Sequence, residues 1–155
     1  MQTTNSDNTQ EQAEQAQQLA QACAQFMLSG DAASQILGIS LLDVNEGEAA
    51  ARMVITSAML NGHKTCHGGV IFSLADSAFA FACNSQNQAA VAAGCTIDFL
   101  LPAFEGDVLT AQAKQIHQGK RSGIYHITIT NQKQQTIALF KGNSARIKRS
   151  VLPET

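Results

Sequence analysis

The sequence contains no tryptophan, and aromatic residues make up only 5% of its 155 residues. Its hydrophobic core must therefore be built mainly from alanine and aliphatic side chains, within a hydrophobic fraction of 45%. No apolar run approaches the roughly 18 residues that a membrane-spanning helix needs. A net charge of −2 and a pI near 6.0 provide no general attraction for nucleic acid or an anionic membrane. The composition therefore predicts a protein that binds neither.

The cysteines form neither a CxxC pair nor the dense framework that is typical of small secreted proteins. They are Cys23, Cys66, Cys83 and Cys95. The sequence also shows no apolar segment of the signal-peptide kind near its start. We therefore expect reduced thiols and a cytoplasmic protein. Histidine and cysteine do not recur at the spacing of a zinc site, so we expect no metal and no organic cofactor.

One shift in composition divides the chain, which at 155 residues has the length of a single domain. Residues 1–10 are polar and predict a disordered N-terminal arm. From about residue 11 the apolar residues recur at helical spacing as far as Gly30, which is expected to end the helix. We assign residues 11–150 to one domain and residues 151–155 to a tail.

Short segments of β pattern predict six strands, two of them before a long apolar segment and four after it. The expected strands are 39–44, 49–56, 91–102, 107–117, 123–130 and 135–147. The apolar segment, about Gly68 to Ser85, has small or apolar residues at nearly every position and predicts a helix buried on all sides. Strands that alternate polar and apolar residues bury only one face. The simplest architecture is thus α+β, with one antiparallel sheet wrapped around this helix.

Asp76 lies in the middle of this apolar helix, where a carboxylate is costly to bury unless something satisfies it. The residues HGG stand at the start of the same helix. The first turn of a helix presents free N–H groups and the positive end of the helix dipole. One short stretch therefore combines a buried carboxylate with a glycine-rich helix start.

Two segments, LNGHKTCHGGVIFSLADSAFAFACNS and AGCTIDFLLPA, together with the order of elements, closely resemble the hotdog-fold acyl-CoA thioesterases. The nearest relatives are the phenylacetic acid degradation thioesterases, and the resemblance covers residues 20–148. It implies the hotdog fold and hydrolysis of aryl-acetyl-CoA thioesters, of the phenylacetyl-CoA or hydroxyphenylacetyl-CoA type, to free acid and coenzyme A. It also implies a homo-oligomer, most simply a dimer of dimers, with active sites at the dimer interface.

The resemblance also implies roles for individual residues. The thioester carbonyl would be bound by the N–H of Gly68 with help from the Asn61 side chain, and Thr96 matches a position that orients water. We expect His67 to play a supporting role at the helix start. The residues expected to contact the acyl-CoA substrate are Gly69, Phe72, Lys120, Arg121 and Arg146, the last three as partners of the coenzyme A phosphates.

Thioester hydrolysis needs a group that delivers an oxygen and donors for the developing oxyanion. Asp76 could act as general base or attack the acyl carbon directly. Gly68 and Asp76 are eight residues apart, which is about 12 Å along a helix axis. One helix cannot bring both to the same carbonyl group, so the two residues of each site would have to come from different subunits.

Other interpretations stay open from the sequence. Asp76 could be a structural carboxylate, Asn61 a simple turn residue, and Thr96 a residue that only favours a strand. The chain could also be a hotdog hydratase or dehydratase, although no histidine lies within the central helix beyond its entrance. A non-catalytic acyl-CoA-binding regulator is a third possibility, although no helix-turn-helix precedes the domain. Gly30 stands where some relatives have an asparagine near the pocket.

Overall fold

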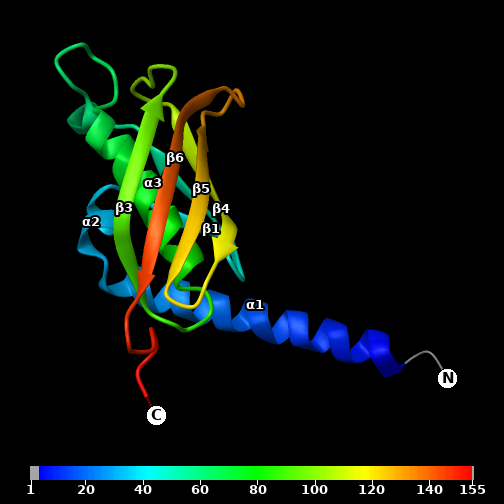
Figure 1. The fold of residues 1–155 in the computed structure, drawn as a ribbon. Coiled ribbons are helices and arrows are strands. Elements are labelled where there is room, and N and C mark those ends of the chain that lie inside the picture. Colours follow the sequence, from blue (N-terminus) through cyan, green and yellow to red (C-terminus); the bar gives the residue numbers. More distant parts are fainter. Residues whose placement is uncertain (1–3, 155) are drawn as a thin grey trace.

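The computed structural model describes residues 4–154 as a six-stranded sheet wrapped around one side of a helix (Figure 1). Along the chain, the elements are α1 (Thr4–Gly30), α2 (Ala32–Ile36), β1 (Ser40–Asn45), β2 (Glu48–Val54), a short 3-10 helix (Ser57–Met59), α3 (Gly68–Cys83), β3 (Ala90–Phe99), β4 (Val108–Gln118), β5 (Ser122–Thr130) and β6 (Thr136–Arg146). The expected α+β fold, the central helix and the strands are confirmed. Their ends differ from the expected ones by at most three residues.

The sheet has the strand order β1-β2-β4-β5-β6-β3, and every neighbouring pair is antiparallel. Strands β4, β5 and β6 form a meander. β3 joins the sheet at its far edge, where it pairs with β6 from Ala90 opposite Arg146 to Phe99 opposite Ala138. Within the described chain no strand pairs with the other edge of β3. Backbone donors and acceptors therefore remain open along this edge.

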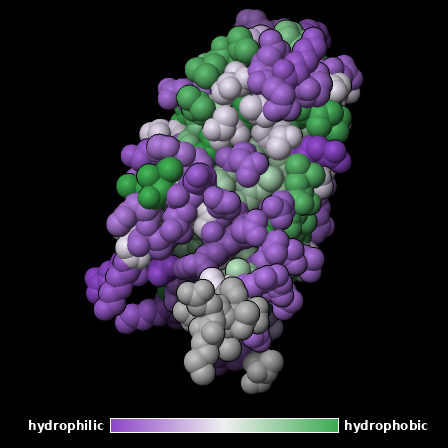
Figure 2. Space-filling view, turned by 90° about the vertical axis from the view of Figure 1, so that its right-hand side faces the viewer, coloured by the Kyte–Doolittle hydropathy of each residue, from purple (hydrophilic) through white to green (hydrophobic). Residues whose placement is uncertain are grey.

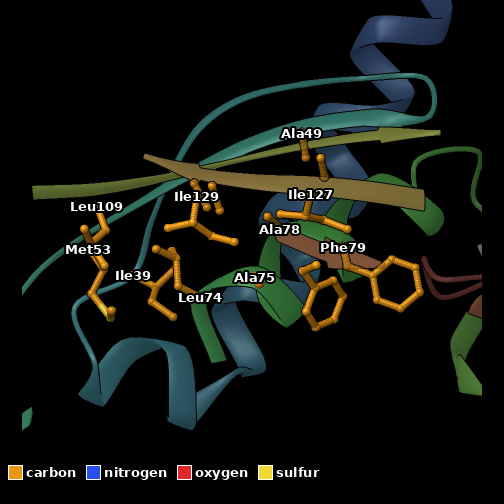
Figure 3. Close-up of a cluster of buried hydrophobic side chains, with 14 of the residues drawn as sticks. Ile39, Ala49, Met53, Leu74, Ala75, Ala78, Phe79, Leu109, Ile127 and Ile129 are labelled. Atoms are coloured by element: carbon orange, nitrogen blue, oxygen red, sulfur yellow. The ribbon is translucent and has the colours of Figure 1, made fainter. Parts of the chain in front are cut away.

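The core lies between α3 and the inner face of the sheet (Figure 3). The strands opposite the helix carry small residues, and the register pairs Ala49 with Ala113 and Ala51 with Ala111. These four alanines are at most 2% exposed. Their small side chains let the helix approach β2 and β4 closely, which explains how a chain poor in aromatic residues fills its interior.

The buried aromatic residues gather where α3 faces β5 and β6. The rings of Phe79 and Tyr125 have centroids 5.5 Å apart, and those of Phe79 and Phe140 lie 6.1 Å apart. A Cβ atom at Gly142 would stand only 2.7 Å from the ring of Phe79. Glycine at this position of β6 is therefore what allows the Phe79 ring to approach the strand so closely.

Helix α3 is not buried on all sides, contrary to the expectation from its composition. Its residues at helical spacing on one face are exposed or only half-buried, and Asp76 is among them. This open face consists of Gly69, Phe72, Ser73, Asp76, Ser77 and Ala80. A single sheet has two edges and covers only one side of a helix, so this open face has no cover within the described chain.

Helix α1 begins earlier than expected. Residues 4–10, expected to be part of a disordered arm, are helical, and residues 1–3 lie outside the described structure. No glycine or proline interrupts residues 4–29, and side chains four residues apart form hydrogen bonds, such as Gln10 to Glu14 at 3.4 Å and Gln15 to Glu11 at 3.4 Å. Such pairs stabilise a helix without tertiary contacts.

The first half of α1 projects beyond the sheet (Figure 1), and residues 8–15 are exposed. The face from which it projects is mostly hydrophilic, with hydrophobic residues in separate groups (Figure 2). The five-residue helix α2, which was not expected, follows immediately and turns the chain back toward α3. No helix in the described part of the chain is both long and apolar enough to cross a membrane.

Candidate active site

At the start of α3, one backbone N–H group is left without an acceptor among the described residues. The carbonyl oxygen of His67 accepts from the N–H groups of Val70 and Ile71, at 2.9 and 3.3 Å. The Nδ1 atom of His67 accepts from the N–H of Gly69 at 3.0 Å. The N–H of Gly68 has no acceptor within the part of the chain that the structure describes. His67 therefore caps the helix, and Gly68 holds its free donor at the positive end of the dipole.

Gly68 and Asn61 line one cavity of about 400 Å³. The Asn61 Oδ1 atom accepts from the N–H groups of His63 and Thr65, and its Nδ2 atom donates to Thr65 Oγ1 at 3.1 Å. Asn61 thus holds its own loop together, as expected of a turn residue. Its Nδ2 carries a second hydrogen that remains available to a ligand in the cavity. The other wall comes from the last residue of β3, Phe99, and the segment that follows it as far as Ala103.

Asp76 lines a different cavity, of about 240 Å³, on the open face of α3. Its apolar wall is formed by Phe72, Leu37 and Ile39. The pKa of the Asp76 carboxyl is raised above its ordinary value of 3.8, first by burial and then by the negative charge of Asp31. A carboxylate with raised pKa in a partly apolar cavity is a common feature of catalytic acids and bases.

Apart from the cationic residues, the expected site residues Gly69, Thr96 and His67 line neither of these cavities. Gly69 is exposed on the open face of α3, and its carbonyl oxygen accepts from Ser73 Oγ at 2.8 Å. Thr96 lies on the outer face of the sheet, opposite Lys141 of β6, while its neighbours Cys95 and Ile97 face the core. A single chain therefore does not bring Thr96 to Asn61 or to Asp76.

The expected cationic residues gather at the opposite end of α3 from Gly68. Lys120 and Arg121 are exposed in the turn between β4 and β5, and the Arg146 N–H donates to the carbonyl oxygen of Arg121 at 2.8 Å. Arg146 pairs with Ala90, which in turn is bound to Asn84 just after α3. The length of α3 places this end about 24 Å from Gly68. Within one chain these cations are remote from the Gly68 cavity.

Asp31 is a site residue that the sequence analysis did not identify. It lies at the corner between α1 and α2, beside Gly30, and lines the same cavity as Asp76. Asp followed three residues later by Ser34 at the start of a helix is an N-cap pattern. This signal was present in the sequence, but α2 spans only five residues and has no periodicity of its own.

The described residues contain no group of three or more histidine, cysteine or acidic side chains that could hold a metal ion. The four cysteines are all free. What the site can supply is a carboxylate of raised pKa, a backbone N–H donor and an amide donor. These are the groups that hydrolysis of a thioester needs.

Comparison with known proteins gives the same assignment. Residues 63–138 match the thioesterase superfamily. The acyl-coenzyme A thioesterase PaaI of Escherichia coli K12 is 55% identical over 131 residues, which cover 84% of this chain and 94% of the relative. The solved structure of the E. coli PaaI protein from the phenylacetic acid degradation operon has a TM-score of 0.85 at 54% identity, covering 86% of this chain and 97% of that one.

A more distant structure, a mutant of the phenylacetic acid degradation protein PaaI from Thermus thermophilus, has a TM-score of 0.73 at 32% identity. It covers 76% of this chain and 100% of that chain. The fold is thus that of a hotdog thioesterase. Within that superfamily the chain belongs to the family of the acyl-coenzyme A thioesterase PaaI. The expected family, fold and enzyme class are confirmed.

Proposed function

We propose that this protein hydrolyses aryl-acetyl-CoA thioesters, such as phenylacetyl-CoA or its ring-hydroxylated forms, to the free acid and coenzyme A in phenylacetate degradation. The observation that carries the proposal is Asp76, a carboxylate of raised pKa beside the apolar side chains of Phe72, Leu37 and Ile39. An aromatic acyl group fits this apolar wall. The names of the relatives support the same substrate class.

Each active site is built from two copies of the chain. Gly68 and Asp76 stand four residues on either side of Phe72, which is near the middle of the open face of α3. A two-fold axis close to Phe72 would place Gly68 of one copy opposite Asp76 of the other, and it would generate two equivalent sites. The same contact would cover the open face.

The open edge of β3 supports this arrangement. Its exposed apolar side chains include Val91 at 48% and Phe99 at 52% exposure. Antiparallel pairing of β3 with β3 of a second copy would satisfy the open backbone groups of both strands. It would also bring the end of the sheet that carries Arg121 and Arg146 toward the Gly68 cavity of the other copy. The cations could then contact the phosphates of coenzyme A.

In the reaction, the thioester carbonyl lies at the Gly68 cavity, and its oxygen accepts from the Gly68 N–H and from Asn61 Nδ2. These donors stabilise the negative charge that develops on the oxygen. The Asp76 carboxylate of the other copy attacks the carbonyl carbon or removes a proton from the attacking water. Collapse of the tetrahedral intermediate expels the thiolate of coenzyme A. Attack by water gives the free acid at once, whereas direct attack by Asp76 leaves a mixed anhydride that a water molecule then hydrolyses to the free acid and the Asp76 carboxylate. Gly69 and Phe72 border the acyl group. Thr96 lies on the edge strand β3 but faces the outer side of the sheet, away from α3, so it takes no step in this mechanism and its role in orienting water stays a prediction.

The oligomer is a dimer at least, and a dimer of dimers is the form we propose from the family resemblance. The four free cysteines fit a cytoplasmic location. The proposed substrate class is tested by a panel of CoA thioesters, with thiol release as the readout. Aryl-acetyl esters should show the highest kcat/KM, above straight-chain esters of similar size. Absence of aryl-acetyl hydrolysis by a folded protein that cleaves other acyl-CoA esters would overturn the proposal.

A further inference from the structure

Asp31 is held at the corner between α1 and α2 by more bonds than a helix cap requires. Its Oδ1 atom accepts from the N–H of Ser34 at 3.0 Å, and its Oδ2 atom accepts from the Ser34 hydroxyl. Ser34, which is only 2% exposed, has its Oγ 2.8 Å from the Oγ of Ser77. Because the Ser34 proton is given to Asp31, the Ser77 hydroxyl donates to Ser34. The corner is thus tied to α3 one residue after Asp76.

Asp31 and Asp76 line the same cavity of about 240 Å³. The cavity is small enough that a ligand touching one carboxylate lies close to the other. A helix cap needs only an acceptor for the Ser34 N–H, which asparagine or serine would supply equally well. The second carboxylate oxygen and the two linked hydroxyl groups therefore call for a further explanation.

We propose that Asp31 is a positioning residue for thioester hydrolysis, which holds a second negative charge at a fixed place beside Asp76 through Ser34 and Ser77. The inference rests on the proposed catalytic role of Asp76. Asp31 itself need not touch the reacting atoms. It acts through Asp76, whose proton it helps to hold.

The surroundings of Asp76 support this assignment. Three ionisable groups from different elements interact with it, namely Asp31 from the corner, Cys83 of α3 and Cys95 of β3. Burial raises the pKa of Cys83 to about 12 and also raises the pKa of Cys95, in both cases with Asp76 adding to the effect. Both thiols are therefore neutral at neutral pH. Asp31 is the neighbour whose charge raises the pKa of Asp76, after burial.

A raised pKa makes the Asp76 carboxylate a stronger base toward water, while protonation abolishes its action at low pH. The acid limb of the pH profile of kcat/KM should therefore report the charge on Asp31. Asp31→Asn removes the charge and keeps a side chain that caps a helix equally well. Asp31→Glu keeps the charge. Asp43→Asn, on the exposed side of β1, is the control for loss of a carboxylate elsewhere.

The experiment measures kcat/KM against pH for the wild type and these three variants, with phenylacetyl-CoA as substrate. Asp31→Asn should move the midpoint of the acid limb down by about 1 pH unit, as expected for removal of a nearby like charge. Asp31→Glu and Asp43→Asn should leave the midpoint near that of the wild type. An unmoved limb in Asp31→Asn, or an equal shift in Asp31→Glu, overturns the inference.

Ser77→Ala provides a second test, because it cuts the link to α3 and leaves both carboxylates and the cap in place. It should shift the acid limb in the same direction by a smaller amount, and an unmoved limb counts against the inference. Asp76→Asn distinguishes this inference from the proposed function. If Asp76→Asn is inactive and the Asp31 variants change nothing, only the role of Asp31 is wrong. If Asp76→Asn is active, the proposed catalytic role has failed first.

Discussion

Gly68 and Asp76 lie on the same helix, eight residues apart, yet each lines a different cavity. The first cavity offers the free N–H of the helix start and the Asn61 amide. The second offers a carboxylate of raised pKa beside an apolar wall. In the proposed mechanism, a single chain therefore carries two incomplete halves of a site. Catalysis would then depend on how two copies bring these halves together.

The first prediction concerns the carboxylate. Asp76→Asn keeps the size of the side chain but removes its ability to attack or to take a proton. We expect kcat to fall by at least about 10²-fold, the scale for loss of a positioned catalytic base. The variant should fold, because an amide costs less to bury than a charge. Steady-state thiol release and circular dichroism check both parts, and near-normal turnover by folded Asp76→Asn would make the carboxylate structural.

The second prediction concerns stability and pH. Since the pKa of Asp76 is raised in the folded state above its ordinary 3.8, charging this group disfavours folding. Below pH 3.8 the wild type bears no such penalty, and as pH rises through the raised pKa the penalty appears in full. The free energy of unfolding of Asp76→Asn, relative to that of the wild type, should therefore increase as pH rises across this window.

Urea unfolding at a series of pH values from about 4 to about 8, at one protein concentration, measures this difference in the free energy of unfolding. The series begins near the ordinary pKa of the carboxyl, where the difference should be smallest. Asp43→Asn is the matched variant for loss of an exposed carboxylate. A difference between Asp76→Asn and the wild type that does not grow with pH would show that Asp76 titrates as an ordinary aspartate.

The third prediction concerns coenzyme recognition. Replacing both Lys120 and Arg121 by Glu should raise KM for a complete acyl-CoA much more than for the corresponding pantetheine thioester, which lacks the nucleotide phosphates. Lys133→Glu is the control, since Lys133 is an exposed cation in the turn between β5 and β6, at the other end of β5. Equal changes in KM for both substrates would mean that Lys120 and Arg121 do not contact the nucleotide of coenzyme A.

The fourth prediction concerns metal ions. The described residues offer no cluster that could hold one, and the proposed steps use only a carboxylate and hydrogen-bond donors. Incubation with a chelator, followed by assay in metal-free buffer, should leave kcat/KM unchanged. Loss of activity that added zinc restores would contradict the mechanism.

Much of the fold follows from local patterns in the sequence. The length of the apolar run from Gly68 to Cys83 predicts a buried helix, and the segments that form β4 and β5 alternate polar and apolar residues as strands do. By contrast, the pairing of β3 with β6 joins segments far apart in the chain, and no local pattern specifies it. The part of α1 from residue 11 to Gly30 follows from its helical spacing, whereas the polar composition of residues 4–10 predicts disorder and the structure shows helix. Residues 4–10 are mainly Thr, Asn, Ser and Asp, which favour helices less than glutamine and glutamate do, so propensity alone does not explain why this segment is helical.

Candidate site residues were recognisable from the sequence where a residue's chemistry is unusual for its position. Asp76 and the HGG start were recognisable because a carboxylate in an apolar helix is unusual. The open face of α3 was not recognisable from the sequence, because an apolar pattern does not show whether the same chain or another copy covers that face. Asp31 was missed because its role depends on a hydrogen-bonded link to Ser77, which is distant in sequence.

The most direct test of the two-chain site combines two inactive variants. Asp76→Asn removes the carboxylate, and Gly68→Pro removes the N–H donor at a position where proline suits the first turn of a helix. A Cβ at Gly68 would lie 3.0 Å from the Phe99 ring, which is half-exposed in a single chain. Gly68→Ala adds the same Cβ but keeps the N–H, so it should retain far more activity than Gly68→Pro.

In a mixed dimer of the two variants, one site carries both defects and the other carries neither. Random mixing makes about half of the dimers mixed, each with one intact site, so about a quarter of wild-type activity should return. The measurement is thiol release by co-expressed variants, after mass spectrometry has shown that mixed dimers are present. Return of about a quarter of the activity is the predicted result. Mixed dimers as inactive as either parent would contradict a site shared between two chains.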